Sequence, residues 1–356
     1  MTAEIRINIQ AVINNIKRIQ ELTDKKIIFV VKGEVYGLGY PLIHYLDQYV
    51  DLYATSSVNE FFCVKQQTDK QVLILSPVSG NQVVNDDQII YSVSSIDQLN
   101  DYKGNKVHNI NCAIKVNTGL NRYGFDYRSR LSEPLSIIQD DLKSEVSDIY
   151  THLAASTSAT EAEQTVSLQF DRLTSCIAAN GLSQLDIHYT DSAALVKQMD
   201  LSTTTSVRTG MTILGLNPIF QQNYAFDYQF PISINCTPTC RSFVEQGGFY
   251  GYEKRTKENI NTMAINIGYC DGIRKSWIGY DIFQSGETPI KLLDVAMNSS
   301  ILQIPESILN TIQLFHTKFS LVDSQEKLSY LADLAKTSIE DIICGFNSIN
   351  IDKVYY

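Results

Sequence analysis

Eight short apolar segments, spaced through the first 210 residues, limit what this chain can fold into. They are rich in β-branched residues, and helical patterns lie between most of them, for example over residues 41–49, 58–66 and 161–180. The eight segments are residues 26–32, 52–55, 72–75, 89–92, 112–116, 148–152, 186–189 and 205–208. Eight strands that alternate with helices over about 200 residues predict a closed (β/α)8 barrel of the TIM type rather than an open sheet.

The sequence pattern changes after the last of these segments. Residues 230–236 and 262–267 alternate between apolar and polar side chains, with glycine breaks between them. This pattern is typical of a small, mostly β C-terminal domain. The alternating residues 4–9 predict a first strand, which is free to pack with that C-terminal domain instead of the barrel. We therefore expect two domains, a barrel and a β domain, over residues 1–223 and 224–356.

Composition excludes several classes of function. A net charge of -10 and a pI near 5.0 argue against a nucleic-acid-binding surface. No apolar run is long enough to span a bilayer, so we expect this chain itself to make no membrane contact. Seven scattered cysteines suit the reducing cytoplasm better than a disulfide framework, and no group of Cys and His has the spacing of a metal site.

Polar side chains gather at the carboxyl ends of the predicted barrel strands. The residues concerned are Lys32, Lys115, His152, His188 and Arg208. A barrel brings these strand ends together at one mouth, where barrel enzymes have their active sites. A lysine shielded from water there loses its proton more readily and can act as a nucleophile that forms a Schiff base. The alternatives are that Lys32 returns to solvent where its strand ends and that His188 is a core histidine.

Residues 30–39, Val-Val-Lys-Gly-Glu-Val-Tyr-Gly-Leu-Gly, resemble the lysine signature of the alanine racemase family, which usually reads V-V-K-A-(D/N)-A-Y-G-H-G. Further stretches resemble family motifs in the family's order, including K-(V/I)-D-T-G-M-x-R-L-G-F, T-H-(F/L)-A, H-x-A-N-S-A, V-R-P-G-I-x-L-Y-G and Y-G…G-Y-x-D-G. They are residues 115–125, 151–154, 188–194, 207–215, 250–251 and 268–272. The resemblance covers essentially the whole chain and implies pyridoxal 5'-phosphate (PLP) as cofactor.

The resemblance also implies catalytic roles. Lys32 would carry the cofactor and act as the base on one face of the substrate. Tyr250 would act on the other face and reach the site from a second subunit, which implies a homodimer. His152 and Arg208 would assist Tyr250, Arg208 would face the pyridine nitrogen, and His188 would orient Arg208.

The remaining site residues are implied in the same way. The phosphate contacts are expected at Tyr36, Ser192 and the backbone of Gly210 and Met211. Arg122 would hold the substrate carboxylate, and Met297 would complete the partner's substrate site. Lys115 resembles a lysine that many family members carbamylate to brace this arginine, although it could also be an ordinary lysine at a strand end.

This chain departs from the family where the substrate and its entrance are expected. Glu340 stands in the stretch where the family usually has a tyrosine, and Asn298 replaces an aspartate of the family. Asp294 replaces a basic residue, and Asn350 and Lys353 stand roughly where the family has two arginines. Serine-racemising relatives also carry a smaller polar residue in place of that tyrosine. We therefore expect a racemase of small amino acids, with serine at least as probable a substrate as alanine, that supplies a D-amino acid for peptidoglycan precursors.

The serine-racemising relatives are catalytic domains of membrane-anchored vancomycin-resistance proteins. This chain could therefore be the cytoplasmic domain of a longer protein. Two other interpretations remain open, a strict alanine racemase and a non-catalytic PLP-binding homologue. A barrel without any cofactor is a third.

Overall fold

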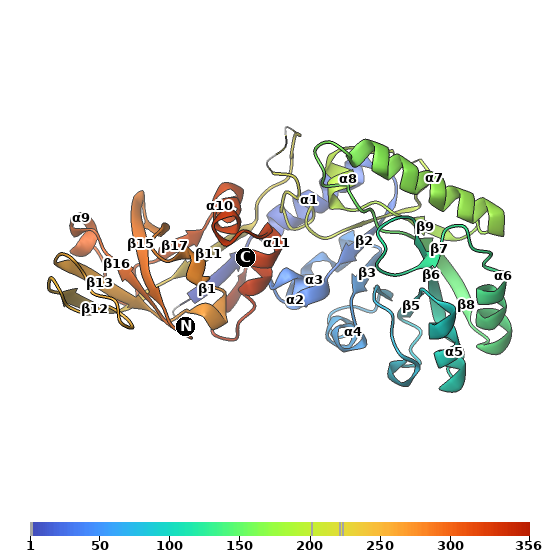
Figure 1. Ribbon diagram of the computed structural model, residues 1–356, viewed down its shortest axis with the longest axis horizontal. Coiled ribbons are helices and arrows are strands. Elements are labelled where there is room, and N and C mark those ends of the chain that lie inside the picture. The colour runs from blue at the N-terminus through green and yellow to red at the C-terminus, as the bar shows by residue number, and fades with distance from the viewer. Residues whose placement is uncertain (1–2, 201, 221, 223) are drawn as a thin grey trace. The chain divides into compact units, whose positions relative to one another are not determined.

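The computed structural model describes residues 3–200, 202–220, 222 and 224–356. The chain forms two compact units (Figure 1), which we call the barrel unit and the β unit. The barrel unit consists of Ile13–Val35 and Tyr40–Tyr228. The β unit consists of Met1–Val12, Tyr36–Gly39 and Gln229–Tyr356. The boundary expected at residue 223 falls on a position outside the described residues.

Eight parallel strands form the sheet of the barrel unit, in the order β10-β2-β3-β4-β5-β6-β8-β9, and the short β7 pairs with β6 beside this path. Their bounds are β2 Lys26–Val30, β3 Leu52–Thr55, β4 Val72–Ile74, β5 Ile89–Val93, β6 Asn111–Asn117, β7 Phe125–Asp126, β8 Glu145–Tyr150, β9 Asp186–His188 and β10 Ser206–Thr209. The predicted barrel of eight strands is therefore confirmed.

Backbone hydrogen bonds bring the two ends of this sheet together. Thr205 N donates to Ile187 O at 2.8 Å, and Arg208 N donates to Thr190 O at 3.2 Å. The sheet interior holds a buried apolar cluster of Ile28, Val30, Ala54, Leu73, Ile90, Ala113 and Tyr150. Strands buried on both faces explain why the segments read as continuous apolar runs.

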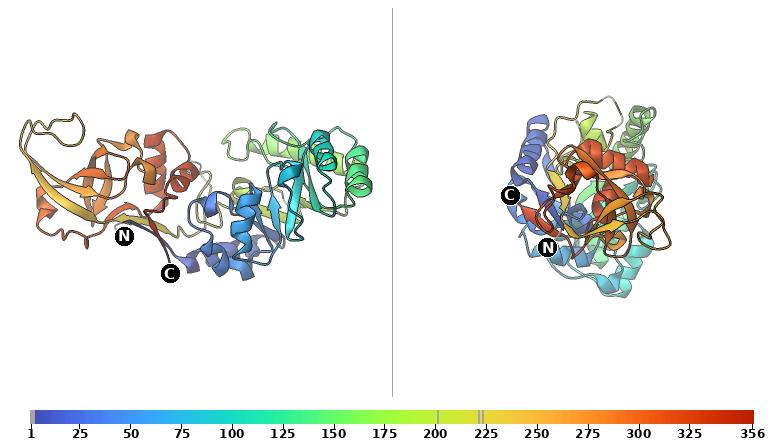
Figure 2. Two further views of the ribbon diagram at one scale, coloured as in Figure 1. Left: turned by 90° about the horizontal axis from the view of Figure 1, so that it is seen from below. Right: turned by 90° about the vertical axis from the view of Figure 1, so that its left-hand side faces the viewer.

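Helices cover the outside of these strands (Figures 1 and 2). Their bounds are α1 Ile9–Leu22, α3 Pro41–Leu46, α4 Val58–Lys65, α5 Ile96–Gly104, α6 Ser132–Ser136, α7 Ala162–Asn180 and α8 Ser192–Val196, with short turns at Asp47–Tyr49, Gly80–Gln82 and Ile137–Asp141. Serine hydroxyls cap two of them, because Ser57 accepts from Glu60 N and Ser95 accepts from Gln98 N. Each such cap stabilises a helix by about 1 kcal/mol and sets where the preceding loop ends.

Nine strands form the sheet of the β unit, in the order β12-β13-β16-β15-β14-β17-β11-β1-β18. Their bounds are β1 Ala3–Ile7, β11 Ile232–Cys236, β12 Pro238–Val244, β13 Ile260–Ile265, β14 Asp281–Ser285, β15 Thr288–Val295, β16 Ser300–Gln303, β17 Phe319–Val322 and β18 Asp352–Tyr355. The N-terminal strand β1 pairs antiparallel with β11 and parallel with β18. It therefore belongs to this sheet and not to the barrel.

Short helices pack on the sheet of the β unit. They are α9 Glu306–Leu309, α10 Gln325–Ala335 and α11 Ile339–Gly345, with turns at Tyr269–Asp271 and Lys275–Trp277. The fully buried Trp277 donates its indole N–H to Leu331 O at 3.0 Å and stacks on Phe346, with ring centroids 6.4 Å apart. This aromatic contact ties α10 and α11 together.

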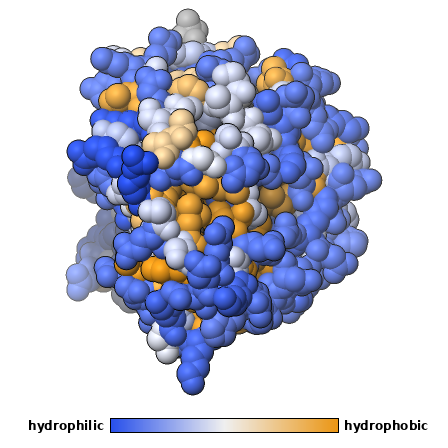
Figure 3. Space-filling model, turned by 90° about the vertical axis from the view of Figure 1, so that its right-hand side faces the viewer, coloured by the Kyte–Doolittle hydropathy of each residue, from blue (hydrophilic) through white to orange (hydrophobic). Residues whose placement is uncertain are grey.

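The surface of the molecule at the α6 and α7 end is mainly hydrophilic, with hydrophobic residues gathered toward the middle of that face (Figure 3). Helix α7 explains part of this pattern, because it buries Val166, Leu173 and Ile177 and exposes mostly polar residues, with Leu168 as an exposed apolar one. Across the described part of the chain, none of the helices has the length and apolar character to cross a membrane.

Candidate active site

The chain makes an unusual left-handed turn directly after β2. This turn, α2 (Lys32–Tyr36), has positive φ at four consecutive residues, with values of 64°, 56°, 54° and 56° from Gly33 to Tyr36. A β-branched residue such as Val35 rarely adopts this conformation, which costs on the order of 1–3 kcal/mol per residue. Glu60 helps to hold the turn, because it accepts hydrogen bonds from Gly33 N at 2.6 Å and from Ser56 N at 2.7 Å. Lys32 is thereby set at the carboxyl end of β2.

Lys115 is buried on β6, at the same end of the barrel, with 4% of its surface exposed. Its ammonium lies 5.2 Å from the ring centroid of Tyr123 and 5.4 Å from that of Tyr150. Burial lowers the pKa of Lys115 to about 7, and the positive charges of Arg208, Arg122 and Lys32 contribute. A substantial fraction of this amine is therefore neutral at neutral pH.

Arg208, at the end of β10, is held by groups from two neighbouring strands. It donates to Thr151 O at 2.9 Å and contacts His152 Nδ1 at 3.4 Å. Its other terminal nitrogen lies 2.5 Å from His188 Nδ1. Burial, followed by the charge of Arg208, lowers the pKa of His152 to about 3, so this imidazole is neutral at physiological pH.

Arg122 lies on the exposed loop between β6 and β7. The Asn117 side chain shapes this loop, because its Oδ1 accepts from Gly119 N at 3.1 Å and from Asn121 N at 3.0 Å. At Gly124, φ is +121°, and a Cβ would lie 2.6 Å from Asn117 N, so only glycine fits there. The loop thus carries Arg122 close enough to affect Lys115 and His152 electrostatically.

The mouth of the barrel therefore brings several basic side chains together. We call Lys32, Lys115, Arg122 and Arg208 the mouth cations. Three of them lower the pKa of the fourth, Lys115, which shows that they lie within electrostatic reach of one another. Such a concentration of positive charge in a protein with a net charge of -10 fits anionic ligands, such as a phosphate ester and a carboxylate.

A pair of hydroxyls lies beside this mouth. Ser192, at the start of α8, and Thr209, at the end of β10, are buried and have their oxygens 2.6 Å apart. Gly210 and Met211 follow directly, and both are buried. The sequence prediction included Ser192, Gly210 and Met211 but missed Thr209, whose only signal was its place next to Arg208.

Asp191 precedes these hydroxyls as the N-cap of α8. It accepts from Ala194 N at 3.0 Å and from Ser156 Oγ at 2.7 Å. Burial raises the pKa of Asp191, although these hydrogen bonds and the charge of Arg208 oppose the rise.

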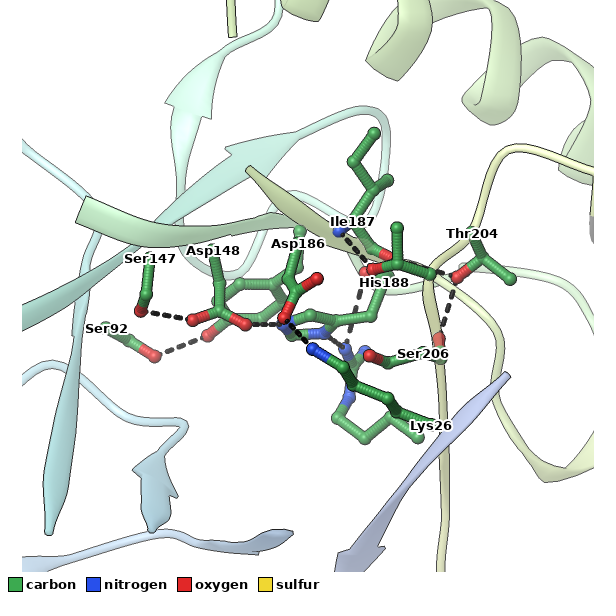
Figure 4. Close-up of polar contacts among 12 residues, drawn as sticks. Lys26, Ser92, Ser147, Asp148, Asp186, Ile187, His188, Thr204 and Ser206 are labelled. Atoms are coloured by element: carbon green, nitrogen blue, oxygen red, sulfur yellow. Dashed lines mark hydrogen bonds and ion pairs between the residues drawn. The ribbon is translucent and has the colours of Figure 1, made fainter. Parts of the chain in front are cut away.

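Polar groups continue into the barrel core around Asp148 and His188 (Figure 4). His188 is completely buried and stacks on Tyr150, with centroids 4.7 Å apart and planes inclined by 14°. Its Nε2 lies 3.5 Å from Asp148 Oδ1, and Asp148 is 4% exposed. At the opposite end of the strands, Lys26 forms an ion pair with Asp186 at 2.7 Å. Asp148 was not among the predicted site residues, although a carboxylate within an apolar strand was a visible signal.

Three predicted site residues, Tyr36, Tyr250 and Met297, belong to the β unit. Burial, with the charges of Glu340 and Cys344, raises the pKa of the half-buried Tyr36 phenol. Met297 is 56% exposed, which is unusual for a methionine side chain. These three residues therefore lie on a different unit from the mouth cations.

Tyr250 lies in the connection between β12 and β13, and Asp294 holds the residues that follow it. Tyr252 N donates to Asp294 Oδ2 at 3.3 Å, and Lys254 Nζ donates to Asp294 Oδ1 at 2.6 Å. The turn closes with Tyr250 N donating to Lys254 O at 2.9 Å. The acidic residue that replaces the family's basic one is thus paired with a lysine of its own unit.

A second set of departures meets at the buried carboxylate of Asp271. It accepts from Asn350 Nδ2 at 2.8 Å and Ser348 Oγ at 2.6 Å, and Asn298 Nδ2 lies 3.5 Å away. Burial alone would raise the pKa of Asp271, but these hydrogen bonds outweigh it and lower that pKa. Neutral amides therefore surround this carboxylate. Within the described ranges, no group of three or more His, Cys, Asp and Glu side chains is placed to hold a metal ion.

Comparisons with known proteins agree with this geometry. A family model described as alanine racemase, N-terminal domain, matches residues 7–218. An alanine racemase of Streptococcus pyogenes is 25% identical over 375 residues, which cover 98% of this chain and 97% of the relative.

Solved alanine racemase structures share the fold along the whole chain. That from Bacillus anthracis, with bound L-Ala-P, superposes with a TM-score of 0.90 at 20% identity, over 100% of this chain and 95% of that one. That from Bartonella henselae, with covalently bound pyridoxal phosphate, has a TM-score of 0.81 at 18% identity and full coverage of both chains. The match of the family model over more than half of the sequence, together with the barrel and its motifs, shows that this chain belongs to the alanine racemase family.

Proposed function

We propose that this protein is a PLP-dependent racemase that interconverts the L and D forms of a small amino acid, serine or alanine. The observation that carries the proposal is the group of mouth cations beside a buried pair of hydroxyls, at the end of the barrel where Lys32 lies. This arrangement would supply an amine, a phosphate site and a carboxylate site in one place. The product would supply D-amino acid for peptidoglycan precursors.

The residues present fit the cofactor. Lys32 would hold it through its amine, and Ser192, Tyr36 and the backbone N–H groups of Gly210 and Met211 would bind its phosphate. When bound, PLP withdraws electrons from the substrate and makes its Cα proton acidic. The acid–base work then falls to the protein.

Two groups would move the proton at Cα from opposite faces. The Lys32 amine would take it on one face, and the Tyr250 phenol of a partner subunit would act on the other. A phenol has an ordinary pKa of about 10, so it needs positive charge nearby to act as a base at neutral pH. Arg208 is suited to supply this charge, and His152, a neutral imidazole 3.4 Å from the guanidinium, would connect the two groups.

Arg208 would donate a hydrogen bond to the pyridine nitrogen of PLP and keep its own proton, because a guanidinium remains charged at any physiological pH. His188 orients Arg208 through the contact at its Nδ1. Proton transfer at Cα would therefore be limited to Lys32 and Tyr250. This favours racemisation over transfer of the amino group.

Lys115 is proposed to carry a carbamate that braces Arg122 at the substrate carboxylate. The neutral amine attacks carbon dioxide and releases one proton, which leaves an anion on the side chain. Burial and the charges of Arg208, Arg122 and Lys32 disfavour the ammonium form of Lys115. The same cations would stabilise the carbamate.

The choice between serine and alanine rests on the β unit. The neutral amides of Asn298 and Asn350 lie beside Asp271 where the family usually has charges, and Glu340 lies near Tyr36. These groups support serine as a substrate, whereas the names of the relatives favour alanine.

A homodimer is part of the proposal, since Tyr250 and the exposed Met297 would complete the partner's site. We propose that the enzyme works in the cytoplasm, where its seven cysteines, none of which forms a disulfide in the described part of the chain, would stay reduced.

The test is proton exchange at Cα in heavy water, with L-alanine and L-serine assayed separately. We expect deuterium at Cα and appearance of the D form with at least one substrate. Lys32→Ala should abolish the deuterium exchange, the appearance of the D form and the visible absorbance of bound PLP. Lys25→Ala, just before the same strand, should leave all three unchanged. Exchange that survives in Lys32→Ala would refute the assignment, and PLP binding without exchange in the unmodified protein would favour the non-catalytic homologue.

A further inference from the structure

We propose that Asp148 is a positioning residue for Arg208 and acts through His188. The proposal rests on the proposed function, but its structural part concerns only the chain's own residues. The three side chains follow one another from the middle of the barrel toward its mouth, as aspartate, imidazole and guanidinium. Figure 4 shows Asp148 and His188 pointing toward each other beneath the strands.

The geometry determines which nitrogen of His188 carries the proton. A guanidinium can only donate, so His188 Nδ1, 2.5 Å from Arg208, must accept. Because burial lowers the pKa of His188, the ring is neutral and its single proton lies on Nε2. Nε2 faces Asp148 Oδ1 at 3.5 Å, a contact outside hydrogen-bond geometry, and it makes no hydrogen bond to any of the described residues.

Asp148 provides this proton with an anionic partner. Burial alone would raise the pKa of Asp148, but the contacts with His188, Ser147 and Lys26 outweigh it and lower that pKa. A carboxylate in a barrel core is costly unless a cation balances it. Arg208 lies on the far side of the imidazole, and Lys26 lies toward the other end of the strands, where Asp186 pairs with it.

Tyr150 restricts the plane of the imidazole but not the direction of its nitrogens. Its ring stacks on His188 at 4.7 Å, and its hydroxyl is fixed by Ser92 Oγ at 2.6 Å. A stacked ring can still flip about its own axis, which would turn Nδ1 away from Arg208. The attraction between Nε2–H and Asp148 opposes this flip. Asp148 also makes the imidazole more basic, which strengthens Nδ1 as an acceptor for Arg208.

The first experiment observes the unmodified protein and uses His188→Gln only to assign the signal. NMR of protein labelled with 15N-histidine should show, at neutral pH, one imidazole N–H on Nε2 that is protected from exchange and absent in His188→Gln. A proton on Nδ1 of His188, or a doubly protonated ring near neutral pH, would overturn the proposal. This measurement stands even if the protein proves not to be a racemase.

The second experiment compares variants. Asp148→Ala should lower kcat by about 10-fold to 100-fold with little change in KM, as loss of a carboxylate that orients a histidine does elsewhere. Asp148→Asn can still accept from Nε2–H and should recover part of this loss. It should also keep the Nε2 signal, whereas Asp148→Ala should lose its protection from exchange.

The matched control is Asp47→Asn. Asp47 accepts from the hydroxyls of Tyr53 at 3.0 Å and Thr68 at 2.5 Å, on the outside of the barrel. The Asp47→Asn variant should be less stable than the parent protein, and its kcat and its His188 signal should be unchanged. Equal effects of Asp47→Asn and Asp148→Asn on kcat would mean that Asp148 acts only through stability and would refute its positioning role.

Discussion

Replacing Lys115 by methionine should change how the stability of the protein depends on pH. The pKa of Lys115 is lowered from 10.5 to about 7, chiefly by burial and then by Arg208 and Arg122. Between these two values the unfolded chain binds a proton at this position that the folded protein does not. By linkage, the free energy of unfolding therefore rises with pH in that window, by about 1.4 kcal/mol per pH unit.

The size of the effect follows from the same two pKa values. Below about pH 7 the folded protein bears the full cost of a buried ammonium, which corresponds to about 5 kcal/mol relative to the neutral amine. Methionine has a similar length and no charge, so Lys115→Met escapes this cost. The variant should be most stabilised relative to the parent near pH 6, and its advantage should shrink by roughly 2–3 kcal/mol between about pH 7 and about pH 9.

The assay is urea unfolding of both proteins without cofactor, in buffers freed of carbon dioxide. Groups that titrate identically in both proteins cancel in the difference. Lys26→Met serves as the control, because hydrogen bonding to Asp186 raises the pKa of Lys26 above 10.5, so its difference should stay flat over this range. Adding bicarbonate near pH 8 should stabilise the parent but not Lys115→Met. A difference for Lys115→Met that does not vary with pH would refute the reasoning.

Three further outcomes follow from the site. His152, with a pKa of about 3, should stay neutral above about pH 5, so replacing it by glutamine should lower kcat without changing the shape of the pH–rate profile from there to about pH 8. Asp294→Ala should loosen the turn after Tyr250 and lower kcat by about 10-fold, measured at saturating substrate, while PLP affinity stays unchanged. Thr209→Val removes the hydroxyl partner of Ser192 and should weaken PLP binding about 10-fold in a spectroscopic titration, since a hydrogen bond to a charged group contributes about 1.5 kcal/mol or more.

Much of the fold could be predicted because its signals are local. Buried parallel strands require continuous apolar runs, and the segment at residues 72–75 corresponds to β4, which ends one residue earlier. The strand expected over residues 148–152 instead begins at Glu145 and ends at Tyr150, so His152 lies just beyond it. The ends of a strand are harder to predict than its middle, because few side chains at the ends must point to one particular face of the sheet.

Parts of the site could not be predicted from local pattern. The left-handed turn at Val35 contradicts that residue's own preference and depends on Glu60, which comes from α4. Thr209 gains its role only because α8 brings Ser192 to within 2.6 Å. Both features depend on contacts between segments that are distant in the sequence.

The amino-acid sequence by itself determined the barrel and the place of Lys32 at its mouth, because hydrophobic periodicity and a lysine signature are properties of short segments. Only the tertiary structure decided the state of the buried groups. Whether Lys115 is charged, and which nitrogen of His188 bears a proton, depends on burial and on charges from other strands. Electrostatic energy in a poorly solvated interior depends on distances in space, and these are not encoded in the spacing of residues along the chain.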